Sequence, residues 1–310
     1  MTKTRAIRFG LALSGGGAKG IAHVGVLKVL EEAQIPVHML AGTSMGGVVA
    51  AAYAAGRSTE EIERFFRSLR LLDIVQRCPT GMGLLGRDKI ADRLRDALGG
   101  DLTFDQLKME LALVAADLET GEEVIIRDGS VVEGVMATTA LPIVFSPLRW
   151  RDHLLIDGGV LNPVPFDVVR HMGADRVIAV HTFHDLPDLQ QTEPSATAKG
   201  REAGPPKGRG AEAFLRLLLY RSHWTPMVHI SEHSFGIVER KLVEQRLQEA
   251  PPDVMIEVPL EGMGLFDLDR VDACLQAGQE AARRRVSELI ELRDAPSPGR
   301  WARWWQSLRR

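Results

Sequence analysis

Two short glycine-rich segments near the start of the chain contain the residues best suited to chemistry. They are Gly15-Gly16-Gly17-Ala18-Lys19-Gly20 and Gly42-Thr43-Ser44-Met45-Gly46. In the second, a serine has a glycine two residues away on either side. This Gly-x-Ser-x-Gly pattern is typical of a nucleophilic serine raised on a sharp turn between a strand and a helix, with glycines where a side chain would clash. The pattern predicts that Ser44 is a nucleophile.

The first glycine segment is a candidate anion site. A serine attacks a carbonyl only when a base takes its proton and hydrogen-bond donors stabilise the oxyanion that forms. Consecutive glycines at a helix start leave backbone N–H groups uncovered, which suits such an oxyanion, and Lys19 either adds positive potential or is solvated. The spacing Gly15-x-Gly17-x-x-Gly20 also matches a dinucleotide-binding loop. A nucleotide-binding module is disfavoured because the next strand ends without an acidic residue to hold a ribose.

The base that would activate the serine is less clear from pattern alone. Asp157 follows an apolar stretch at residues 154–156 and precedes Gly158 and Gly159, so its carboxylate is expected at a sheet edge with close backbone approach. An Asp-Gly pair is equally typical of an ordinary turn. His153 and His181 are alternative bases, although neither stands in a recognisable base motif.

The segments that must position these residues alternate between strand-like and helix-like patterns. Strands are predicted at residues 7–13, 39–42, 111–116, 123–127, 154–156, 177–180 and 254–258, and helices at 21–30, 45–55, 59–69, 88–98, 131–139 and 272–292. Each glycine segment follows a strand and precedes a helix, so both are expected at the same edge of a parallel sheet. The predicted fold class is therefore α/β, with a mainly parallel central sheet between helices.

Composition restricts the class of protein. The chain has 310 residues, 45% of them hydrophobic, and a formal charge of -3, which gives no reason to expect a nucleic-acid partner. Cys78 and Cys274 stand alone, so neither a disulfide framework nor a zinc site is expected. No stretch reaches the roughly 18 apolar residues of a membrane span, and no signal peptide is recognised. We expect a cytoplasmic protein without metal or cofactor.

The chain is predicted to contain one main domain and a short tail. The domain covers residues 1–295, with a flexible insertion at 185–210 that is rich in proline, glycine, serine and charge. The tail covers residues 296–310. In a helix, Trp301, Trp304 and Trp305 share one face and arginines lie elsewhere, which suits peripheral contact with the inner membrane surface. The alternative is that these tryptophans fold back onto the domain.

Together, the two glycine segments and Asp157-Gly158-Gly159 resemble, in order and context, the patatin-like phospholipases. Ala137-Thr138-Thr139-Ala140-Leu141-Pro142 and Leu161-Asn162-Pro163-Val164-Pro165 resemble the bacterial branch related to neuropathy target esterase. The resemblance covers roughly residues 5–180. Ile143 and Ser146 depart from the glycine and proline that relatives favour there, which bears on the shape of the acyl pocket.

The resemblance implies a serine-aspartate dyad, with Ser44 as nucleophile, Asp157 as base, and the amides of Gly15, Gly16 and Gly17 as the oxyanion hole. Histidine, metal and cofactor are not needed. The supporting motif residues are Lys19, Gly20, Gly42, Gly46, Gly158 and Gly159. The implied function is hydrolysis of phospholipid or lysophospholipid esters through an acyl-enzyme. Two alternatives are an esterase or thioesterase acting on soluble acyl compounds and a non-catalytic nucleotide-binding module.

Overall fold

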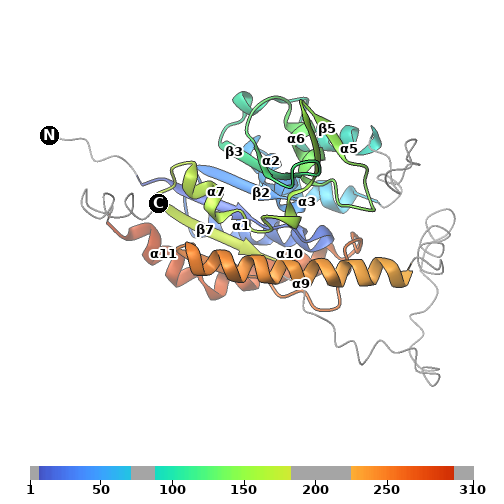
Figure 1. Ribbon diagram of the computed structural model, residues 1–310. Helices are drawn as coiled ribbons and strands as arrows, with labels where there is room; N and C mark the ends of the chain where they lie inside the picture. Colours follow the sequence, from blue (N-terminus) through green and yellow to red (C-terminus); the bar gives the residue numbers. More distant parts are fainter. Residues whose placement is uncertain (1–6, 71–87, 183–224, 297–310) are drawn as a thin grey trace, which may run out of the picture.

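The computed structural model describes residues 7–70, 88–182 and 225–296 (Figure 1). The predicted insertion at residues 185–210 and the tail with Trp301, Trp304 and Trp305 lie outside these residues, as does Cys78.

The predicted α/β fold is confirmed. In the described residues, eight strands form one sheet: β1 (Phe9–Leu13), β2 (Met39–Thr43), β3 (Glu110–Asp117), β4 (Glu123–Ile126), β5 (Leu148–Trp150), β6 (His153–Asp157), β7 (Arg176–His181) and β8 (Val254–Glu257). Hydrogen-bonded neighbours run β5-β6-β3-β2-β1-β7-β8, and β4 also pairs with β3. Strands β3, β2, β1, β7 and β8 are parallel, while β4, β5 and β6 pair antiparallel.

Strands β2 and β6 share one edge of β3. Leu113 and Val114 pair with both β2 and β4, whereas Ala115 and Ala116 pair with both β4 and β6. A strand residue has one neighbouring strand on each edge, so β4 occupies one edge and β2 and β6 occupy the other, one after the other. Because β2 is parallel to β3 and β6 is antiparallel to it, the carboxyl ends of β2 and β6 point toward each other.

Helices cover both faces of the sheet (Figure 1). They are α1 (Ala22–Glu32), α2 (Met45–Ala54), α3 (Thr59–Ser68), α5 (Asp88–Leu98), α6 (Val131–Thr138), α7 (Phe166–His171), α9 (Thr225–Glu249), α10 (Val271–Arg284) and α11 (Val286–Asp294). Short 3-10 turns are η1 (Gly17–Ile21), η2 (Phe104–Gln106) and η3 (Gly158–Val160).

Alternate side chains of the central strands enter two separate cores. Leu11 and Leu13 pack with α1, α2 and α10, whereas Ala12, between them, packs with α7 and α9. This alternation is the period of two expected of a strand covered on both sides. The sheet is therefore the middle of three layers, and the candidate site forms at its edge.

The closing helix and strand β5 differ from the sequence-based prediction. The closing helix predicted at residues 272–292 is two helices, α10 and α11, separated at Arg285, where the backbone N–H bonds to Ala282 instead of continuing the α-helical pattern. Neither glycine nor proline marks this break. Strand β5 was not predicted, since a three-residue strand is too short to show a period.

Candidate active site

Ser44 occupies the sharp turn between β2 and α2. Its backbone has φ 54° and ψ -126°, a conformation that costs energy for any residue with a side chain. The flanking glycines are required by space. A Cβ on Gly42 would lie 2.6 Å from Gly47 Cα, and a Cβ on Gly46 would lie 2.3 Å from the Ser14 carbonyl oxygen. The turn thus holds Ser44 in the raised geometry that the motif predicts.

Thr138 holds this turn from α6. Its hydroxyl accepts the Ser44 N–H at 2.9 Å and donates to the Val114 carbonyl on β3 at 2.5 Å. Thr138 is fully buried. Sequence reasoning did not assign it a role, although it lies in the Ala137-to-Pro142 segment that carried part of the family resemblance. Its two bonds connect the serine turn to the centre of the sheet.

Asp157 lies at the end of β6, where β6 meets the end of β2. Thr43 pairs with Val114 and Asp157 pairs with Ala115, so the residue before the serine and the aspartate stand beside consecutive residues of β3. The turn after Asp157 is equally tight, because a Cβ on Gly158 would lie 2.3 Å from the Val114 carbonyl oxygen. The Thr43 hydroxyl also donates to the Asn162 carbonyl at 2.8 Å, which ties the two turns together.

Asp157 is buried, with 2% of its surface exposed, and its carboxyl has a raised pKa. Burial raises its pKa to about 6, while hydrogen bonding by the Ser44 hydroxyl and by the Gly159 N–H lowers that pKa, and the negative charge of Glu239 raises it. Oδ1 accepts the Gly159 N–H at 2.8 Å. Oδ2 is buried and has no hydrogen bond of ordinary geometry with the described residues. This oxygen is available to take up a proton.

The first glycine loop lies directly against the serine. A Cβ on Gly15 would be 3.4 Å from Ser44 Cβ, and one on Gly20 would be 2.6 Å from Met45 Cγ. Gly15 itself donates its N–H to the Pro163 carbonyl at 3.1 Å. In the described part of the chain, the N–H groups of Gly16 and Gly17 donate to no carbonyl or side chain. Of the three predicted oxyanion donors, these two are therefore unengaged.

Lys19, His153 and His181, the other candidate residues from the sequence, are all engaged elsewhere or buried. Lys19 is buried at 3% exposure, so the interpretation that it is solvated is wrong. His153 pairs through Nδ1 with Asp117 Oδ2 at 2.8 Å and stacks on Trp150. His181 Nε2 lies 3.4 Å from Glu239 Oε1 on α9. Both histidines are thus paired with carboxylates other than Asp157.

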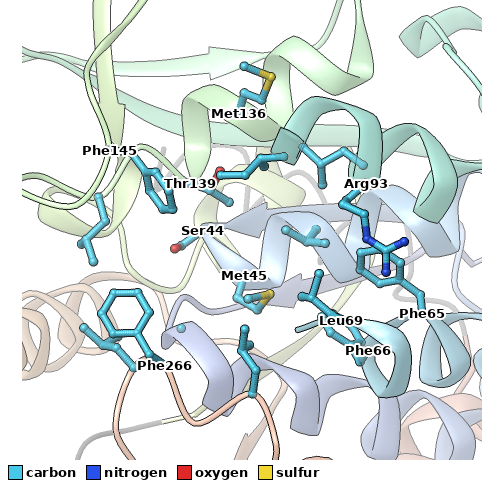
Figure 2. Close-up of a pocket in the computed structure, with 17 residues that line it drawn as sticks. Ser44, Met45, Phe65, Phe66, Leu69, Arg93, Met136, Thr139, Phe145 and Phe266 are labelled. Atoms are coloured by element: carbon cyan, nitrogen blue, oxygen red, sulfur yellow. The ribbon is translucent and has the colours of Figure 1, made fainter. Parts of the chain in front are cut away.

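A cavity of about 130 Å³ opens beside Ser44 (Figure 2). Its lining is almost wholly apolar and includes Met45, Phe65, Phe66, Leu69, Leu94, Met136, Leu141, Phe145, Leu265 and Phe266. The charged member of the lining is Arg93, whose guanidinium lies over the Phe65 ring, 5.7 Å from the ring centroid. Such a cavity suits a hydrocarbon chain attached to a carbonyl that is held at Ser44.

Among the described residues, no group of three or more histidine, cysteine, aspartate or glutamate side chains is arranged to hold a metal ion. Among the same residues, no helix is both long and apolar enough to span a bilayer.

Comparison with known proteins identifies the family. Residues 11–170, which include both glycine loops and Asp157, match the family model described as patatin-like phospholipase. The chain belongs to the patatin-like phospholipase family. The resemblance inferred from the sequence motifs is thereby confirmed, and with it the assignment to a family of lipid hydrolases.

Curated relatives support the NTE branch. An uncharacterized NTE family protein of Mycobacterium tuberculosis is 35% identical over 196 residues, covering 62% of this chain and 54% of that protein. A second uncharacterized NTE family protein from the same organism is 30% identical over 289 residues, covering 91% of this chain and 47% of that protein. Mouse patatin-like phospholipase domain-containing protein 6 is 33% identical over 177 residues, covering 55% of this chain and 13% of that protein. The chain spans about half the length of the first of these relatives.

A solved structure supports the fold. VipD from Legionella pneumophila superimposes with a TM-score of 0.53 at 14% identity, covering 92% of this chain and 68% of that one. At this identity, the likeness concerns the patatin fold alone.

Proposed function

We propose that this protein is a serine acyl hydrolase that cleaves the carboxylic ester bonds of phospholipids or lysophospholipids through Ser44 and Asp157. The observation that carries the proposal is the meeting of β2 and β6 on one edge of β3, which brings a strained serine beside a buried, basic carboxylate. A binding module would have no need of either feature.

In the first half of the proposed reaction, Ser44 Oγ bonds to the ester carbonyl carbon and passes its proton to Asp157. The carbonyl π electrons move to the oxygen, where the N–H groups of Gly16 and Gly17 stabilise the charge. The tetrahedral intermediate then collapses, the bond to the leaving alcohol breaks, and this alcohol takes the proton from Asp157. Water repeats the sequence on the acyl-enzyme and releases a fatty acid.

The pKa of Asp157 suits this role. A carboxylate with a pKa of about 6 is largely ionised at neutral pH, yet it is a stronger base than an exposed aspartate. Oδ2, which accepts no hydrogen bond of ordinary geometry among the described residues, is the atom to which the proton transfers in this proposal. A histidine is not required, since His153 and His181 are paired elsewhere.

The substrate class is proposed from the cavity. Its apolar lining beside Ser44 favours an apolar acyl chain over a polar acyl group. Peripheral contact with the inner membrane surface through Trp301, Trp304 and Trp305 stays a prediction, as does the assignment of residues 1–295 to one hydrolase domain. The alternative, an esterase or thioesterase acting on soluble acyl compounds, uses the same dyad.

The proposal is tested with the wild type, Ser44→Ala and Asp157→Asn. A fluorophosphonate probe should label the wild type and not Ser44→Ala, and both variants should lose turnover of a phospholipid by several orders of magnitude. A series of esters from short to long acyl chains then separates the alternatives. Rates that rise with chain length and with aggregation of the lipid support a phospholipase, whereas a preference for short soluble esters contradicts it.

A further inference from the structure

The carbonyl of Gly15 is held by two hydroxyl groups that the proposed reaction does not use. Thr182 Oγ1 donates to this carbonyl at 2.7 Å, and Ser14 Oγ donates to it at 3.0 Å. The Thr182 N–H in turn donates to Ser14 Oγ at 2.9 Å. Ser14 and Thr182 are both fully buried. One peptide of the glycine loop is therefore fixed by side chains rather than by regular secondary structure.

The two hydroxyls reach the loop from the side away from the nucleophile. Ser14 follows β1 and Thr182 follows β7, and these strands pair in parallel with Leu13 opposite Val180. Strand β1 pairs with β2, which leads to Ser44, on its other edge. The glycine loop after β1 thus has Thr182 on one side and Ser44 on the other.

The direction of the Gly16 N–H follows from the direction of the Gly15 carbonyl. In a trans peptide, the C=O and the following N–H point in opposite directions, and the described chain has no cis peptide. The Gly15 carbonyl points to Thr182, so the Gly16 N–H points toward the side on which Ser44 lies. This N–H has no protein acceptor among the described residues. Gly16 has φ 133°, and a Cβ on it would be 2.5 Å from Thr182 Oγ1.

We infer that Ser14 and Thr182 are positioning residues that fix the Gly15–Gly16 peptide with its N–H directed at the oxyanion. This inference rests on the proposed function. A peptide between two glycines can rotate at little steric cost, and the opposite orientation would present a carbonyl oxygen to the developing negative charge. Holding the donor in place before the reaction is what makes an oxyanion hole effective.

The test compares Thr182→Val, which removes the hydroxyl at nearly constant shape, with Thr182→Ser, which keeps it. Each variant is assayed for kcat and KM on p-nitrophenyl octanoate and for inhibition by an octyl trifluoromethyl ketone. Ser44 adds to this ketone and forms a charged hemiketal oxygen, so its affinity reports on the oxyanion hole.

Thr182→Val should lower kcat by about 10- to 100-fold, with KM within about twofold of the wild-type value. The affinity for the ketone inhibitor should fall by the same factor as kcat/KM. Thr182→Ser should stay within about threefold of the wild type. Thr59→Val is the matched control, because Thr59 is also fully buried and its hydroxyl donates at 3.0 Å to Glu31, away from the loop. It should keep the wild-type kcat.

Ser14→Ala provides a second variant if Thr182→Val does not fold, and the same fall in kcat and ketone affinity is expected of it. The inference is overturned if these variants keep the wild-type kcat, if kcat falls while ketone affinity does not, or if Thr182→Ser loses as much as Thr182→Val. Failure of the proposed function is distinguishable, because then the wild type itself would neither hydrolyse the ester nor react with a fluorophosphonate.

Discussion

Thr43 and Asp157 stand opposite consecutive residues of β3, at the carboxyl ends of two strands that run toward each other along the same edge. Ser44 follows Thr43 directly, so the register of one central strand determines how the two proposed catalytic groups meet. A parallel strand and an antiparallel strand are both needed for this arrangement. The mixed sheet thus brings the two proposed catalytic groups together at one edge of β3.

The pH dependence of the rate should reflect the buried carboxylate. As the proposed base, Asp157 accepts a proton only when ionised, so kcat/KM should fall as the pH drops through about 6, the value to which burial raises its pKa. An ordinary exposed aspartate would give a fall near pH 4. The profile should be measured on a soluble, uncharged ester, whose own ionisation does not change. A rate that stays constant from pH 8 to 4.5 would contradict Asp157 as the base.

Replacing Glu239 should shift the acid limb of the pH profile, which is the fall of kcat/KM at low pH. Its negative charge on α9 raises the pKa of Asp157, and its Oε1 faces His181 Nε2 at 3.4 Å. Glu239→Gln removes the charge, so the acid limb of kcat/KM should shift to lower pH. Glu244→Gln is the control, since Glu244 lies on the same helix, is half-exposed and pairs with Lys241. If the acid limb shifts equally in both variants, the shift reflects a general change in surface charge and not the charge of Glu239 near Asp157.

Asp157 should destabilise the folded protein at neutral pH. Its pKa is raised on folding, so the neutral carboxyl is favoured in the folded state. The associated stability is fully present below pH 4, and it is lost as the pH rises through about 6. Asp157→Asn should therefore raise the free energy of unfolding at pH 8, on the order of 2–3 kcal/mol, and much less at pH 4. Urea denaturation at both pH values measures the difference; an equal effect at both would refute the charge as its cause.

Thr138 should matter for both catalysis and stability. Thr138→Val leaves the Ser44 N–H and the Val114 carbonyl without their partner, which should cost about 1–3 kcal/mol of unfolding free energy. It should also lower kcat, because the serine turn is no longer held. Thr138→Ser keeps both bonds and should recover most of the loss. Urea denaturation and ester kinetics on the two variants check this, and a serine variant as impaired as the valine variant would show that the methyl group matters instead.

The local features of the site were predictable from the sequence, whereas the contacts between segments were not. Ser44 and its flanking glycines form a pattern within five residues, and strand-loop-helix patterns placed both glycine loops at one sheet edge. The sequence pattern alone left two interpretations of Asp157 open, a catalytic base and an ordinary turn residue. Its burial and its register on β3 support the proposal that it is the base, and neither is visible in a local pattern.

The supporting contacts join residues far apart in the chain. Thr138 reaches Ser44 from α6, and Thr182 reaches Gly15 from the end of β7. The engagement of the Gly15 N–H by Pro163 has the same character. A threonine hydroxyl has no sequence signature for such a role, because its partner is set by tertiary packing.

Ile143 is a strained residue next to the cavity, and relieving its strain should stabilise the protein. It is β-branched, 49% exposed, and has φ 74°, a left-handed conformation that suits glycine or asparagine. The turn is held by bonds from the N–H groups of Val144 and Phe145 to the Leu141 carbonyl, and Phe145 lines the cavity. Ile143→Asn should therefore raise the free energy of unfolding by about 0.5–1.5 kcal/mol.

The matched control for this change is Ile125→Asn. Ile125 is also exposed, at 37%, but it lies in β4 without a positive φ, so the same replacement there should leave stability unchanged or lower it. Thermal unfolding of both variants beside the wild type measures the difference. If Ile143→Asn instead lowers the unfolding midpoint below that of the wild type, the prediction is wrong, and contacts of the Ile143 side chain outweigh the backbone strain.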